Sequence, residues 1–186
     1  MRYGRQTAPD PGTTHPADDY PCRFCALESG TCCRTDPKLA DLIFPLSRPE
    51  GARLEEYGQN PGAFRAVRRN TPEFVQSVQA LFPGEKARIK ELFPDGGEHF
   101  SLALRNDGAC AFLGNFGCVL PRARRPWYCL LFPVWVINHS LTLFSADNCL
   151  IVRRSGNPAR AVDLMGESVA GIRRLFACLR RDWGFE

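Results

Sequence analysis

Cysteine content constrains this chain more than any other sequence feature, because nine cysteines occur in 186 residues. A chain of this length buries a sizeable core without covalent help, so the thiols are not needed to rescue a very small fold. Positions 34–109 contain no cysteine and separate two groups. The groups are Cys22, Cys25, Cys32 and Cys33, and Cys110, Cys118, Cys129 and Cys149. The ninth, Cys178, lies in a segment with helical periodicity and is expected to pack in the core.

The sequence predicts a cytoplasmic protein that does not contact a membrane. Its first 20 residues are polar and rich in proline, without the apolar segment of a secretory signal peptide. The longest apolar run, Cys129–Ile137, is too short to span a bilayer. In the cytoplasm thiols stay reduced, so clustered cysteines indicate metal binding or catalysis before disulfides.

The first cysteine group has metal-ligand spacing. Two residues between Cys22 and Cys25 allow one tight turn to direct both sulfurs at one metal ion. A thioredoxin-like redox pair shares this spacing but follows a strand, whereas a polar, proline-rich segment precedes this one. Neighbouring side chains point in different directions, so Cys32 and Cys33 do not easily share one metal. Either one binds and the other packs, or they serve two centres, as in a binuclear site or a cluster.

The second cysteine group is spread over loop-rich sequence. Gly114 and Gly117 lie between Cys110 and Cys118 and permit a tight loop. Any one of these four cysteines alone could be a buried, inert thiol. Because four more cysteines lie upstream, these four are better interpreted as metal ligands than as isolated buried thiols. Eight cysteines suffice for two four-thiolate sites, and four thiolates suit both zinc and iron–sulfur clusters.

The remaining sequence predicts an α+β fold, with a small irregular β core and several packed helices around the cysteine-ligated metal sites. Residues 1–20 are expected to be a disordered leader, and residues 21–186 a single domain. Within the domain, positions 34–99 predict a mostly helical insert. Positions 158–183 predict one C-terminal amphipathic helix, because apolar residues recur there every three or four positions.

Local signals place several elements within this scheme. Helix starts are indicated at Asp36-Pro37, Ser47-Arg-Pro-Glu50 and Thr71-Pro72, each of which has a capping side chain before or at the first turn. Strands are predicted over 100–104, 130–137 and 141–145.

The charge pattern gives weak support for a nucleic-acid partner. Arg122, Arg124 and Arg125 lie beside Trp127 and Tyr128, a combination that could contact phosphate and stack on bases. The net charge is only +4, which disfavours this alternative. A positive charge next to sulfur favours the thiolate, so Arg125 is better interpreted as a neighbour of a metal site.

Three motifs in order carry a family resemblance. Cys22, Cys25, Cys32 and Cys33 form an opening group; Leu46-Ser47-x-x-Glu50 follows as a helix entry; Cys110-Ala-Phe-Leu, Cys118 and Arg125-Pro126-x-x-Cys129-x-x-Phe132-Pro133 form a closing half. In these residues the chain resembles the YkgJ-like cysteine-cluster family, described as zinc- or iron-chelating proteins with a CxxCxxCC-type signature. The resemblance runs from Cys22 to Cys149 and implies that the eight cysteines ligate metal.

The resemblance leaves the biochemical role open. It implies a metal-binding protein that chelates zinc or iron, the latter as an ion or an iron–sulfur cluster. Related cysteine-cluster sequences include flagellin lysine N-methylases, which implies an iron–sulfur-dependent enzyme as the alternative. No glycine-rich turn between a strand and a helix marks a separate cofactor-binding module. A protein partner is left open.

Overall fold

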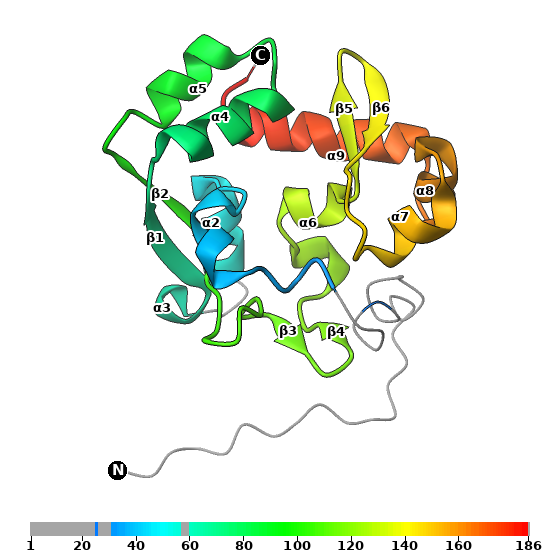
Figure 1. The fold of residues 1–186 in the computed structure, drawn as a ribbon, viewed down its shortest axis with the longest axis horizontal. Coiled ribbons are helices and arrows are strands. Elements are labelled where there is room, and N and C mark those ends of the chain that lie inside the picture. The colour runs from blue at the N-terminus through cyan, green and yellow to red at the C-terminus, as the bar shows by residue number, and fades with distance from the viewer. Residues whose placement is uncertain (1–24, 26–30, 57–59, 186) are drawn as a thin grey trace.

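The computed structural model describes residues 25, 31–56 and 60–185. The expected leader, residues 1–20, and the candidate ligand Cys22 lie outside this part of the chain. The α+β prediction is confirmed: in the described residues, helices surround three separate two-stranded antiparallel sheets. Figure 1 shows that the sheets do not join, so the β structure is small and irregular, as expected.

Three predicted helix starts are confirmed. The helices are the 3-10 helix η2 (Pro37–Leu42), α2 (Arg48–Glu56) and α4 (Pro72–Leu81). Asp36 accepts a hydrogen bond from the backbone N–H of Lys38, and Thr71 accepts one from Phe74. Side chains at these positions replace the hydrogen bonds that the first turn of a helix lacks.

The expected helical insert, positions 34–99, also contains a strand. Two further short helices lie there, α3 (Pro61–Phe64) and α5 (Lys86–Leu92). Between them β1 (Arg65–Arg69) pairs antiparallel with β2 (Glu98–Leu102), with Val67 opposite Phe100. The sequence Arg-Ala-Val-Arg-Arg has no apolar alternation, so its pattern did not predict a strand.

The region after position 110 holds the two other sheets and several short helices. These elements are β3 (Leu113–Gly114), β4 (Gly117–Cys118), η3 (Arg122–Arg124), α6 (Trp127–Leu131), β5 (Val134–Ile137), β6 (Ser140–Leu143) and α7 (Leu150–Ser155). The strand predicted over 130–137 is therefore partly helix. Asn138 and His139 form the turn that follows β5, both with positive φ.

The single helix predicted over 158–183 is wrong. The structure has two helices, α8 (Pro158–Leu164) and α9 (Val169–Asp182). Gly166, at a φ of +65°, follows α8, and Ser168 caps α9 by accepting a hydrogen bond from the Gly171 N–H. The apolar periodicity continues across the break and therefore does not reveal it.

The main core lies where α4, α5, α6, α8 and α9 pack around β5. Trp135 of β5 is 1% exposed, and Phe44, Phe82 and Phe176 pack around its ring with centroid separations of 5.2–5.7 Å. In Figure 1, α9 lies across the β5–β6 hairpin and links the α4–α5 side to the α7–α8 side. Among the described residues, no helix is both long and apolar enough to cross a membrane.

A second, smaller core adjoins the cysteines. Its buried residues are Leu46, Leu54, Phe64, Phe112 and Leu120. Cys110 and Cys118 pack against it, so the second cysteine group lies at the edge of this minor core.

Candidate metal centre

Backbone pairing brings the first cysteine group to the second. The N–H of Cys110 donates to the carbonyl of Cys33 at 2.7 Å, and the N–H of Thr35 donates to the carbonyl of Gly108 at 2.9 Å. Gly108 has a φ of +76°, and a Cβ atom there would lie 2.3 Å from the Thr35 carbonyl oxygen. Glycine therefore permits the close approach that joins two segments more than seventy residues apart.

Five cysteines line one cavity: the exposed Cys32, and four half-buried cysteines that come from different segments. Of these four, Cys33 lies before η2, Cys110 lies before β3, Cys118 ends β4, and Cys129 lies in α6. All four carry free thiols and are half-buried. The cavity has a volume of about 350 Å³. The chain thus gathers around one space five sulfur atoms that the sequence predicted as ligands.

Two of these sulfurs accept hydrogen bonds from backbone N–H groups, and in both cases the donor lies two residues after the cysteine. The N–H of Phe112 donates to Cys110, and that of Leu120 donates to Cys118. A hydrogen bond to sulfur stabilises the charged thiolate relative to the thiol. Hydrogen bonds to thiolates are also among the features that tune cysteine-ligated clusters.

The thiols would repel one another as thiolates. Burial raises the pKa of Cys110 to about 12 and also raises the pKa values of Cys118 and Cys129, and the neighbouring sulfurs add to each shift. A hydrogen bond with Cys32 instead lowers the pKa of Cys33 to about 7. A bound cation would stabilise all four charges together, so the donor set fits a metal that prefers sulfur.

Arg125 lies beside these thiols. Its Nε donates to the Leu120 carbonyl at 3.1 Å, and its guanidinium also donates to the Cys118 carbonyl at 3.5 Å. The positive charge contributes to lowering the pKa of Cys33. Arg122 forms an ion pair with Glu167. Two of the three arginines proposed as phosphate contacts are therefore engaged within the chain.

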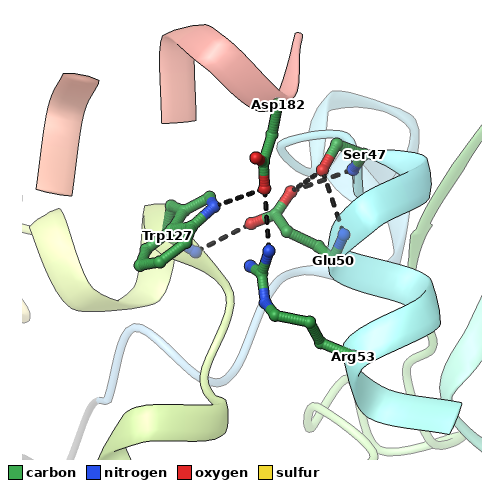
Figure 2. Close-up of polar contacts among 5 residues, drawn as sticks. All are labelled: Ser47, Glu50, Arg53, Trp127 and Asp182. Atoms are coloured by element: carbon green, nitrogen blue, oxygen red, sulfur yellow. Dashed lines mark hydrogen bonds and ion pairs between the residues drawn. The ribbon is translucent and has the colours of Figure 1, made fainter. Parts of the chain in front are cut away.

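A buried carboxylate fixes the helix that carries Cys129. Glu50 is the second half of the capping box at the start of α2: its Oε2 accepts hydrogen bonds from the Ser47 backbone N–H at 2.9 Å and hydroxyl at 2.6 Å. Its Oε1 accepts one from the Trp127 N–H, at the first residue of α6, at 2.8 Å. Burial raises the pKa of Glu50, and these hydrogen bonds oppose that shift. Figure 2 shows the carboxylate between α2 and α6.

The same clamp extends to α9. The indole Nε1 of Trp127 donates to Asp182 at 2.7 Å, and Arg53 pairs with the same carboxylate oxygen at 2.8 Å (Figure 2). The Arg53 guanidinium also lies 4.4 Å from the centroid of the Trp127 ring. The sequence predicted Glu50 only as a helix cap. It gave no sign of the role of Asp182, since no local signal links that residue to a helix more than fifty positions earlier.

Two further candidate ligands lie apart from the first four. Cys25 and Cys149 are buried and interact electrostatically. Cys149 accepts hydrogen bonds from the N–H groups of Ile151 and Val152, although burial still raises its pKa. Cys149 also lines a second cavity of about 440 Å³ together with Cys32. Both members of the adjacent pair line the first cavity, and Cys32 also lines the second.

The remaining sequence candidates lie elsewhere. Cys178 is half-buried in α9 rather than fully packed in the core. His139 lies in the β5–β6 turn, as expected. His99 is buried in β2, where its Nδ1 pairs with the Asn70 side-chain oxygen at 2.9 Å.

Within residues 25, 31–56 and 60–185, no three His, Cys, Asp or Glu side chains are already grouped as a metal-binding set. The four thiols would therefore have to close on an ion or cluster. Comparisons with protein-family models, curated proteins and solved structures gave no match. The fold and site define an α+β protein with a thiol-lined cavity.

Proposed function

We propose that this chain binds zinc or an iron–sulfur cluster through its clustered cysteines, with Cys33, Cys110, Cys118 and Cys129 as the principal ligand set. The observation that carries the proposal is their convergence on one cavity from four segments. Four thiols suit both metal classes. The motif resemblance to YkgJ-like cysteine-cluster proteins supports the same chemistry.

The division of the cysteines supports a second centre. Cys25, Cys32 and Cys149 are its candidate ligands among the described residues, and the sequence adds Cys22. Adjacent residues Cys32 and Cys33 would then serve different centres, which resolves the difficulty of directing neighbouring side chains at one metal. Arg125 would offset part of the negative charge that thiolates bring to the first centre.

Metal analysis of the intact chain tests the proposal. The protein is purified without oxygen, and zinc, iron and acid-labile sulfide are measured per chain together with the visible spectrum. Iron matched by sulfide, with broad visible absorption, identifies a cluster; zinc in a colourless protein identifies a zinc site. A folded chain that holds neither metal contradicts the proposal.

Matched cysteine variants locate the ligands. Cys110→Ser is expected to remove the metal of the first centre, and Cys149→Ser only that of the second. Cys178→Ser is the control, because Cys178 lies in α9 outside both groups. Equal metal content in all three variants would contradict the assignment of ligands.

A further inference from the structure

The cavity beside the thiols is larger than a metal centre requires. Its volume is about 350 Å³. A metal ion bound by four thiolates lies about 2.3 Å from each sulfur, so it occupies only the thiol-lined end. Small-molecule sites start at roughly 300 Å³. The whole cavity is at the lower end of that range, so beside a single metal ion it leaves room for one small organic molecule, and beside an iron–sulfur cluster it leaves less.

Most of the lining other than the cysteines is apolar. It includes Leu39, Leu42, Ile43, Phe44, Leu102 and Leu104. Apart from the cysteines, Arg125 is the one described lining residue with an ionisable side chain that is charged at neutral pH, and it donates to backbone carbonyls. A charged ligand would lose its hydration on entering this cavity. The described lining residues offer no carboxylate to pair with a cation and no second cationic side chain to pair with an anion, so charged ligands are disfavoured. The lining instead matches an uncharged, mainly apolar molecule.

Two leucines of this apolar lining are also open to water. Leu39 is 52% exposed and Leu42 is 41% exposed. Both belong to η2, which has no buried residue. Single exposed leucines are ordinary, but apolar side chains that line a cavity and reach solvent form a continuous apolar entrance, as at ligand-binding grooves. A bound apolar molecule would bury surface that water now contacts.

We propose that this cavity binds a small, uncharged, mainly apolar organic molecule next to the metal-bearing thiols. The ligand's position relative to a metal rests on the proposed function, whereas the binding itself rests only on the cavity. The ligand enters past η2 and lies against the apolar lining, beside the sulfurs.

The test uses the full chain, purified without oxygen and with its metal content measured. Uncharged 1-aminoanthracene is titrated by fluorescence, and toluene is added as a competitor. Leu42→Trp narrows the entrance and is expected to weaken probe binding about tenfold. Val67→Trp is the control, because Val67 is 58% exposed on β1 and does not line the cavity. It should bind the probe like the wild type.

A second measurement places the ligand against the thiols. A chelator removes the metal with and without toluene, using EDTA for zinc or bathophenanthroline for iron. Toluene should slow metal release in the wild type and in Val67→Trp, but much less in Leu42→Trp. Metal-loaded protein that binds no probe, or binds it equally well in Leu42→Trp, would overturn the ligand site while the metal proposal stands. Probe binding without any metal would support the cavity and overturn the metal proposal.

Discussion

The two cores of this molecule are built from different material. Around Trp135, seventeen buried residues and a network of aromatic rings form one continuous apolar cluster. Around the thiols, five of the described residues form the buried cluster, and the cavity beside them is open. Burial of apolar area is the main favourable term in folding, so the first region has much the larger intrinsic stability.

The difference indicates what a metal would do here. The thiol region joins segments that are distant in sequence through a few backbone hydrogen bonds, such as Cys110 to Cys33. A metal ligated by both segments would close that long loop and supply the free energy that its small core lacks. The aromatic region needs no such help. The two regions should therefore respond differently to loss of metal and to substitutions in the aromatic core.

Metal removal is expected to have the largest effect and to act on one region only. A structural thiolate site contributes on the order of 10 kcal/mol. Chelation, or the double variant Cys110→Ser/Cys129→Ser, should raise hydrogen exchange in segment 103–119 and leave β5–β6 protected. Hydrogen-exchange mass spectrometry on both forms measures this. Equal loss of protection in both segments would show that the regions are not independent, and Cys178→Ser should match the wild type throughout.

The converse change weakens the aromatic region. Trp135 is fully buried and its Nε1 donates to the Leu81 carbonyl at 2.9 Å. Trp135→Ala should lower the free energy of unfolding by about 3–5 kcal/mol, because it removes a large core side chain and leaves a cavity. Metal content per folded chain should be unchanged. Denaturant unfolding and metal analysis test both points, with the exposed Val67→Ala expected to change stability by less than about 0.5 kcal/mol.

The sequence predicted some parts of this arrangement well, because their signals are local. The Ser47–Glu50 capping box and the Thr71 cap lie within one turn of their partners, and both are present. β1 was missed because a five-residue strand with three arginines has no alternating pattern. The break between α8 and α9 was missed because apolar spacing continues through Gly166.

The site was predicted only as a set of residues. Cysteine spacing identified candidate ligands, but not which thiols share a cavity, since that depends on contacts between distant segments. The pairing of residues 33–35 with 108–110, and the clamp from Glu50 to Trp127, are such contacts. Whether adjacent Cys32 and Cys33 face one cavity or two was likewise a question of tertiary structure.

Gly108 allows the pairing between the cysteine groups to be tested without changing a ligand. Gly108→Ala should cost roughly 2–4 kcal/mol, combining about 1 kcal/mol for a positive φ with the clash against the Thr35 carbonyl. It should also weaken metal retention against a chelator. Gly96→Ala is the matched control: its φ is +68° with no atom within 4 Å, so it should cost only about 1 kcal/mol and retain metal normally. Equal effects of the two variants would contradict the role assigned to the close approach.

The smallest predicted effect concerns His99, which lies on β2 and connects the two regions. Its ring stacks on Phe74 of the aromatic core at 3.7 Å between centroids, and its strand ends at Leu102, which lines the cysteine-lined cavity. Burial lowers the pKa of His99 to about 4, and the charge of Arg68 adds to this shift, whereas Asp41 opposes it. The unfolded chain, with an ordinary histidine pKa near 6.5, therefore binds the proton first, and stability is lost as pH falls from about 6.5 to 4.

At pH 5 this linkage should cost about 2 kcal/mol relative to pH 7. Acidification also protonates carboxylates and releases metal from thiolates, but it does so in the wild type and in every variant. The quantity to compare is therefore the difference in unfolding free energy between the wild type and each variant. The gap in unfolding free energy between the wild type and His99→Gln should shrink by that amount from pH 7 to pH 5. Val67→Ala, which removes no ionisable group, should keep the same gap from the wild type at both pH values. A gap between the wild type and His99→Gln that stays constant with pH would mean that His99 is not held neutral at the junction of the two regions.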